Sequence, residues 1–84
     1  MASYEIRFKR SVAKDLRDIP KKDVKRILNT IDALAKDPFC PGCKKLAGKD
    51  YYRVRQGNFR VIYEVLNDAL IIHIVRVAHR SRAY

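Results

Sequence analysis

The sequence holds few of the residues that mark a metal centre, a nucleotide-binding loop or a membrane anchor. Two cysteines, two histidines and three glycines occur among its 84 residues, and tryptophan is absent. No ligand set at metal-binding spacing and no glycine-rich phosphate loop can be found. No apolar run is long enough to span a bilayer, and the opening MASYEIRFKR lacks the apolar segment of a signal peptide. We therefore expect one cytoplasmic domain over residues 1–84, without metal, cofactor or membrane contact.

Acidic residues are scarce as well. Nine Asp and Glu stand against 19 Lys and Arg, which gives a formal net charge of +10. This excess opposes folding by self-repulsion and attracts polyanions. The partners it indicates are nucleic acid, an anionic membrane surface or an acidic protein, and we favour nucleic acid or an acidic protein. A hydrophobic content of 48% is typical of a globular chain with one small core.

The last third of the chain predicts three antiparallel strands. Apolar and polar residues alternate over 51–56, 59–66 and 69–77, which is typical of half-buried strands. Gly57-Asn58 and Asn67-Asp68 lie between these runs and predict tight turns.

The first part of the chain predicts one strand and two helices. Tyr4, Ile6 and Phe8 alternate with charged residues, and Pro20 separates two helical stripes, either ending the first helix or opening the second. The first stripe is Val12, Leu16 and Ile19, and the second is Val24, Ile27, Leu28, Ile31, Leu34 and Ala35. We predict an α+β fold in the order β-α-α-β-β-β, with both helices on one face of a mainly antiparallel four-stranded sheet. The sequence does not determine the edge at which the first strand pairs.

Residues 37–49, DPFCPGCKKLAGK, predict an irregular segment because two prolines and two glycines interrupt it. Cys40 and Cys43 form a C-x-x-C motif, for which three interpretations remain. A redox dithiol would need a helix start behind it, and a zinc site would need two further ligands. The third interpretation is a pair of loop thiols that stay reduced in the cytosol.

Cationic residues occupy the polar positions of the predicted strands. Arg53 and Arg55 are two residues apart and project from the same side of their strand, and Arg60 follows the first turn. A guanidinium offers a planar fork of donors that matches phosphate oxygens and stabilises the charge of a phosphorane-like transition state. The basic face of the second helix is either a solvated surface or an RNA contact.

Aromatic residues are interleaved with these cations. Tyr63 and Phe59 alternate with Val61 and Val65, so we assign them to the core. Tyr84 lies beyond the last strand and is either a frayed end or a ring on which a base stacks. Without a metal set or a catalytic triad, RNA cleavage would use the 2′-hydroxyl of the substrate as nucleophile.

The stretch YYRVRQGNFRVIYEV, followed by a hydrophobic strand and VAHRSRAY, resembles the RelE/ParE superfamily of toxins, and its RelE-type branch in particular. The similarity covers nearly the whole chain and includes KKLAGKDYYRVR. It implies a ribosome-dependent endoribonuclease that cuts mRNA in the A site of the 70S ribosome, leaving a 2′,3′-cyclic phosphate and a 5′-hydroxyl. It also implies an antitoxin that wraps the toxin, with operator DNA bound only through the toxin–antitoxin complex. The charge alone predicts that an acidic, helical antitoxin segment would be attracted.

The resemblance also implies site residues. The catalytic set would be Arg53, Arg55, Arg60, His79, Arg80 and Tyr84, and the RNA-binding set would be Lys44, Lys45, Lys49, Arg76 and Arg82. Some relatives carry lysines at positions 53 and 55, and an arginine cannot take their role as a base. His79 is the candidate base, with a turn residue as the alternative. Glu64 is the only acidic residue inside the three strands, and we assign it no role.

Two other functions remain open. A ParE-like toxin would bind DNA gyrase without cleaving RNA, and a plain nucleic-acid-binding module would have the cationic clamps without turnover. Retention of the arginines and of Tyr84 favours the nuclease.

Overall fold

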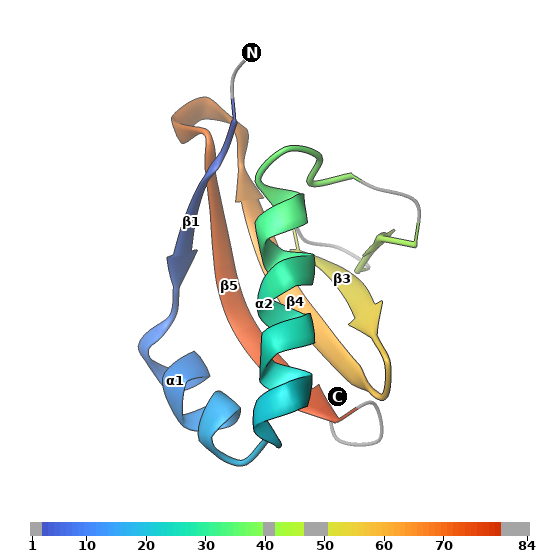
Figure 1. The fold of residues 1–84 in the computed structure, drawn as a ribbon. Helices are drawn as coiled ribbons and strands as arrows, with labels where there is room; N and C mark the ends of the chain where they lie inside the picture. The colour runs from blue at the N-terminus through green and yellow to red at the C-terminus, as the bar shows by residue number, and fades with distance from the viewer. Residues whose placement is uncertain (1–2, 40–41, 47–50, 80–84) are drawn as a thin grey trace.

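The structure is a computed structural model that describes residues 3–39, 42–46 and 51–79. Its sheet has five strands in the spatial order β1-β5-β4-β3-β2. The strands are β1 (Glu5–Phe8), β2 (Lys44–Lys45), β3 (Tyr51–Gln56), β4 (Phe59–Leu66) and β5 (Ile71–His79), and the helices are α1 (Arg10–Arg17) and α2 (Lys21–Leu34). Both helices lie on one face of the sheet (Figure 1). The predicted α+β architecture is confirmed.

The prediction of four strands was wrong by one. The additional strand β2 lies in the segment predicted to be irregular and pairs antiparallel with β3, Lys44 opposite Arg53 and Lys45 opposite Tyr52. Two residues are too few to show an alternating pattern, so the sequence gives no sign of this strand. β5 also begins two residues later than predicted, because Asn67–Ala69 form a short 3-10 helix.

The first strand pairs with the last. β1 runs parallel to β5, from Glu5 opposite Ile71 to Phe8 opposite Ile74. The backbone N–H of Lys9 donates to the carbonyl oxygen of Ile74 at 2.8 Å and extends this ladder into the start of α1. Parallel strands need a long crossover connection, and the two helices and the β3–β4 hairpin provide it here.

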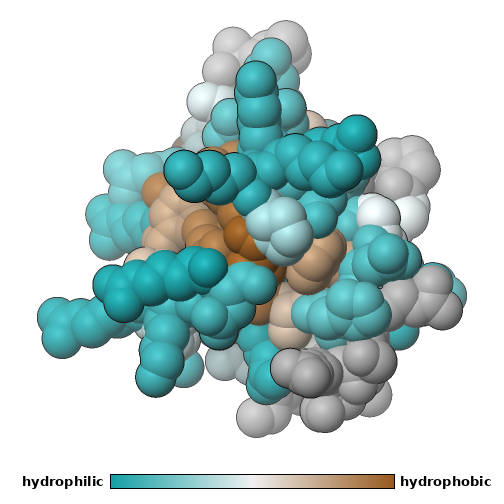
Figure 2. Space-filling view, turned by 60° about the horizontal axis from the view of Figure 1, so that its bottom comes forward, coloured by the Kyte–Doolittle hydropathy of each residue, from teal (hydrophilic) through white to brown (hydrophobic). Residues whose placement is uncertain are grey.

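The helices follow from their apolar stripes. Ile27, Ile31 and Leu34 of α2 are buried, as their spacing predicts. Pro20 opens α2 and does not end α1, since its carbonyl oxygen accepts from the N–H of Asp23 at 2.9 Å. Hydrophilic side chains dominate the surface at the end of the molecule shown in Figure 2 and surround a central apolar area. Within the described ranges, neither helix is long and apolar enough to cross a membrane.

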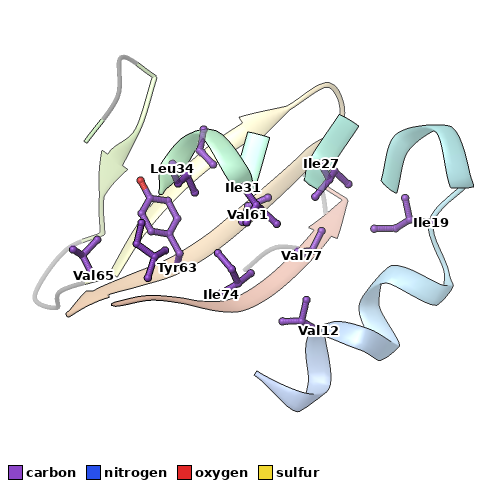
Figure 3. Packing of buried hydrophobic residues seen from close by; sticks show 12 residues of the cluster. Val12, Ile19, Ile27, Ile31, Leu34, Val61, Tyr63, Val65, Ile74 and Val77 are labelled. Carbon is purple, nitrogen blue, oxygen red and sulfur yellow. The ribbon is translucent and has the colours of Figure 1, made fainter. Parts of the chain in front are cut away.

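The core lies between the helices and the sheet (Figure 3). Val61, Tyr63 and Val65 project from β4 toward the helices, and Tyr63 is fully buried. Its hydroxyl donates to the carbonyl oxygen of Pro38 at 2.6 Å, which satisfies the polar tip of a buried ring. Phe59 packs against the same cluster. The assignment of Phe59 and Tyr63 to the core is therefore confirmed.

A β-bulge at Val75 changes which residues of β5 face the core. Ile62 of β4 lies opposite Arg76 and Tyr63 lies opposite Ile74, so Val75 has no residue opposite it. Strict alternation from Ile74 would turn position 76 toward the helices. The extra residue shifts the alternation, so Val77 is buried at 2% exposure and Arg76 is exposed.

Candidate anion-binding site on the sheet

The sheet face turned away from the helices, which we call the outer face, gathers five cationic side chains. Val54 and Val61 are buried on the helix side, so their neighbours along β3 and β4 point outward. Cross-strand pairing then aligns the cations on one surface. This cationic cluster consists of Lys44, Arg53, Arg55, Arg60 and Arg76.

Two arginines of the cluster face each other directly. Arg55 and Arg60 are cross-strand partners in the β3–β4 hairpin. Like charges at directly opposed positions of two strands repel each other. Gly57, whose φ is 59°, closes this hairpin in the left-handed region that glycine adopts without strain. The hairpin thus brings two guanidinium-bearing side chains to adjacent positions on the outer face.

Ile62 lies at the centre of the cluster. It is 9% exposed although both helices of the described residues lie on the other face, and it does not belong to the helix-side core. Its cross-strand neighbours are Arg53 on β3 and Arg76 on β5. Arginine stems bury readily along apolar surface while the guanidinium stays in water. Ile62 therefore offers these two side chains an apolar surface beside their own strands.

A depression of about 310 Å³ lies at the β2 side of the cluster and is lined by Gly42, Lys44, Arg53, Val54 and Arg55. Planar guanidinium forks beside an ammonium group are suited to phosphate oxygens, which they bind in pairs. The site can accordingly bind the backbone of a nucleic acid and stabilise extra negative charge on a phosphate.

The opposite end of the outer face is electrostatically mixed. Glu64 lies between Tyr51 and His73 in the strand register, and its Oε1 is 3.5 Å from Nδ1 of His73. Arg7 of β1 forms an ion pair with Glu5 on the same face. The sequence analysis did not anticipate the Glu64–His73 pair, because its signal lies in the register between two strands.

Two predicted site residues do not lie with the cluster. Lys45 is opposite Tyr52, whose ring packs on the core, so Lys45 lies on the helix side. His79 is opposite Phe59 and makes an edge-on ring contact with it at 5.6 Å between centroids. The candidate base thus lies at the end of β5, on the helix side of the sheet. Lys49, Arg80, Arg82 and Tyr84 lie outside the described residues.

Asp15 of α1 is a structural contributor that the sequence does not reveal. Its Oδ2 accepts a hydrogen bond at 3.2 Å from the backbone N–H of Val77, immediately after the bulge. A depression of about 220 Å³ at this junction is lined by Asp15, Asp18, Ile19, Phe59, Arg76, Val77, Ala78 and His79. α1 thereby holds the segment of β5 that leads from Arg76 to His79.

The described residues include no group of three or more His, Cys, Asp or Glu side chains arranged to hold a metal ion. Cys43 is half-buried and packs against the core, whereas Cys40 lies outside the described ranges. The interpretation of the C-x-x-C motif as a pair of loop thiols stays a prediction.

The fold and the cationic cluster define a class of protein: a small basic α+β domain with helices on one sheet face and a cationic surface on the other. Comparison with known proteins identifies the family. Residues 6–84 match the family described as the ParE toxin of the type II toxin–antitoxin system parDE. The chain belongs to this toxin family.

Individual relatives carry RelE names. The putative toxin RelE1 of Methanocaldococcus jannaschii is 38% identical over 85 residues, covering 96% of this chain and 94% of the relative. The archaeal RelE–RelB complex from Pyrococcus horikoshii contains a chain with 31% identity and a TM-score of 0.80, with coverage of 96% and 99%. The RelBE2 complex of Mycobacterium tuberculosis shares the fold, with a TM-score of 0.84 at 23% identity and coverage of 94% and 100%. The protein is a RelE-like toxin of a type II toxin–antitoxin system, and the predicted membership of the RelE/ParE superfamily is confirmed.

Proposed function

We propose that this toxin is a metal-independent endoribonuclease that cleaves mRNA in the ribosomal A site. The observation that carries the proposal is the cationic cluster, in which Arg55 and Arg60 are directly opposed. Two guanidinium groups on adjacent strands suit a ligand that brings two or more negative charges. A phosphodiester approaching its transition state is a ligand of this kind.

The proposed reaction needs only acid–base groups and cations. The 2′-oxygen of a ribose attacks the adjacent phosphorus while a base removes the 2′-proton. The bond from phosphorus to the 5′-oxygen of the next nucleotide breaks, and that oxygen receives a proton. The products are a 2′,3′-cyclic phosphate and a 5′-hydroxyl, so atoms and charge balance without a metal or an oxidant.

We assign roles by position. Arg53, Arg55 and Arg60 would clamp the reacting phosphate, and Arg80 would stabilise the leaving oxygen. His79, the base predicted from the sequence, lies on the helix side of the sheet and away from these arginines, so we assign the removal of the 2′-proton to no described residue; an arginine does not act as a base at neutral pH. Tyr84 would stack on the substrate base. The path of the RNA backbone would follow Lys44, Lys45, Lys49, Arg76 and Arg82.

The proposed partners are a RelB-type antitoxin and the 70S ribosome with its mRNA. The antitoxin proposal is supported by the Pyrococcus horikoshii relative, which forms a RelE–RelB complex. We propose that operator DNA is bound only through the toxin–antitoxin complex. A toxin that acts on translating ribosomes would work in the cytoplasm.

Primer-extension mapping on ribosomes paused with a defined A-site codon tests the proposal. We expect the wild-type protein to cut within that codon. Arg55→Ala, Arg60→Ala and Arg80→Ala should each lower the single-turnover cleavage rate by about 10²–10³-fold, which is the usual loss for removing one transition-state donor. Ribosome affinity, measured by co-sedimentation, should change far less. Arg26→Ala on α2, which removes an exposed charge on the helix side, is the matched control and should cleave normally.

Two outcomes would replace the proposal. If affinity and cleavage fall in parallel, the arginines supply binding in the ground state and the transition state alike, as expected for a plain nucleic-acid-binding module. If the folded wild-type protein makes no cuts, a gyrase supercoiling assay is the next experiment. The family match, whose description is a ParE toxin, is the observation that favours this second function.

A further inference from the structure

A row of three side chains crosses the outer face immediately beside the cationic cluster. It consists of Tyr51 on β3, Glu64 on β4 and His73 on β5, which are cross-strand partners in the register. We call it the mixed row, because it joins an aromatic ring, a carboxylate and an imidazole. The proposed reaction assigns no role to any of the three.

The mixed row is adjacent to residues proposed to hold the RNA backbone. Tyr51 and Arg53 are two positions apart on β3 and project from the same face, which separates their Cα atoms by about 7 Å. Glu64 has the same relation on β4 to Ile62, at the centre of the cluster. A nucleotide whose phosphate is held by Arg53 can therefore place its base over the mixed row.

Glu64 determines which part of an RNA strand fits this row. It is the one carboxylate in the strands β2, β3 and β4, and it would repel a phosphate group. The RNA backbone is therefore kept away from the row, whereas a base that offers N–H donors is attracted. The side chains of Glu64 and His73 are 29% and 34% exposed, so a ligand can reach both.

The three side chains supply the contacts with which proteins read single-stranded bases. Such bases stack on aromatic rings and form hydrogen bonds through their Watson–Crick edges. Tyr51, which is half-buried, offers a ring, and the carboxylate of Glu64 offers two acceptor oxygens and no donor. Nδ1 of His73 lies 3.5 Å from Oε1 of Glu64, so the imidazole flanks the carboxylate and limits the directions in which it can turn.

The pattern of donors selects guanine among the four bases. Guanine presents N1–H and the N2 amino group side by side, so it can donate one hydrogen bond to each oxygen of a carboxylate. Adenine and cytosine each place a ring-nitrogen acceptor beside their amino group, and this acceptor would face one of the carboxylate oxygens. Uracil has one N–H between two carbonyl oxygens. Only guanine therefore satisfies both oxygens of Glu64.

We propose that the mixed row is a guanine-binding subsite, in which the base stacks on Tyr51 and donates to Glu64 while His73 holds the carboxylate in place. The inference rests on the proposed function in taking RNA as the ligand, and it adds a sequence preference. The cationic cluster binds the backbone of any RNA, and the mixed row favours a guanosine beside the held phosphate. Contacts to phosphates position a strand, and contacts to bases specify it.

NMR titration of the full-length chain with short RNAs tests the subsite without a ribosome. The probes are the pentanucleotides UUGUU, UUIUU and UUAUU, where I is inosine, which is guanosine without its N2 amino group. All three carry 2′-O-methyl groups, so their 2′-oxygens cannot attack the phosphate. We expect UUGUU to shift the amide signals of Tyr51, Glu64 and His73. It should also bind at least about tenfold more tightly than the other two, each of which lacks a donor to a charged acceptor.

Glu64→Gln gives the sharpest test, because it should change the preferred base. A glutamine amide carries one acceptor and one donor group, which together match the amino group of adenine and the ring nitrogen beside it. We expect this variant to bind UUAUU at least as tightly as UUGUU. Glu5→Gln is the matched control, since it removes the same charge from β1 on the outer face, and should keep the preference for guanine.

Variants of the two flanking residues separate stacking from positioning. Tyr51→Leu should weaken the binding of all three RNAs at least about fivefold, since every base loses its stacking partner, and should keep the order of preference. His73→Phe should reduce the preference for guanine. His73→Gln, whose amide can donate to the same carboxylate oxygen, should restore most of it.

Equal affinity for the three RNAs, no binding of any of them, or an unchanged preference in Glu64→Gln would overturn the subsite. So would amide shifts confined to the cationic cluster. These outcomes are distinct from those of the cleavage test. A toxin that cuts ribosome-bound mRNA but binds the three RNAs alike retains the proposed function without the subsite. A toxin that prefers UUGUU but makes no cuts retains the subsite without the proposed function.

Discussion

The two faces of the sheet are built from the same strands and differ almost completely in chemistry. On β4, Val61, Tyr63 and Val65 face the helices and are 0%, 0% and 6% exposed. Ile62 and Glu64, which alternate with them, and Arg60, which precedes them, face the opposite side of the sheet. Burial of apolar area stabilises a protein by about 25 cal/mol per Å², so the helix-side face supplies the folding free energy. The outer face gathers mostly charged side chains, and these are the residues to which the proposed function assigns the binding of RNA.

The comparison implies that the faces can be altered independently. Changes on the helix side should lower the free energy of unfolding. Changes in the cationic cluster should instead alter the binding and cleavage of RNA.

Tyr63→Ala should lower the free energy of unfolding by about 3–5 kcal/mol, the usual loss for an aromatic core side chain. In a domain with about 5–15 kcal/mol of total stability, this variant approaches unfolding at room temperature. Urea denaturation followed by circular dichroism measures the loss. Tyr63→Phe is the matched variant, which removes only the hydrogen bond to the carbonyl oxygen of Pro38 and should cost about 1 kcal/mol. Equal losses for both variants would mean that the hydroxyl, and not the packing of the ring, dominates.

Asp15→Ala should lower the free energy of unfolding by about 1–2 kcal/mol, because the N–H of Val77 loses its acceptor beside the bulge. Amide hydrogen exchange at Val77 should become faster than at Ile74, which lies before the bulge. Asp15→Asn keeps a side-chain oxygen that can accept the bond and should recover part of the loss. If exchange at Val77 were the same in all three proteins, Asp15 would not hold this segment.

Arg55→Thr should raise the free energy of unfolding by about 0.2–1 kcal/mol at low salt, because it removes the charge opposite Arg60 and keeps a residue that favours strands. The gain over wild type should shrink as NaCl rises, since salt screens the repulsion. Urea titrations at two salt concentrations measure it. Arg26→Gln, on α2, should show no comparable gain. A loss of stability in Arg55→Thr would mean that contacts of the Arg55 side chain outweigh the repulsion.

The sequence predicted the strands whose two faces alternate without interruption. β3 and β4 begin and end at the predicted residues, and Gly57 lies in the turn between them, because strict alternation and a glycine turn are local signals. The outward orientation of Arg53 and Arg55 followed from the same period of two. These features depend on neighbours within a few residues, which the sequence displays directly.

Features that depend on distant residues were not predicted. The parallel pairing of β1 with β5 was left open because it joins segments more than 60 positions apart. β2 was missed because two residues have no periodicity. The bulge at Val75 was missed as well. Its one local sign is Arg76, because strict alternation after Ile74 would place this charged residue in the core. His79 faces the helix side in part because this bulge shifts the alternation after Ile74.

The pairing of β1 with β5 cannot form until almost the whole chain has been synthesised. Residues 5–8 leave the ribosome early and have no strand to pair with until residues 71–74 follow. β5 also supplies Ile72, Ile74 and Val77 to the core, so the incomplete chain lacks a large part of what holds its helices. Contacts between such distant segments form late in folding. A growing chain is therefore expected to remain unfolded, and hence inactive, until its translation is almost finished.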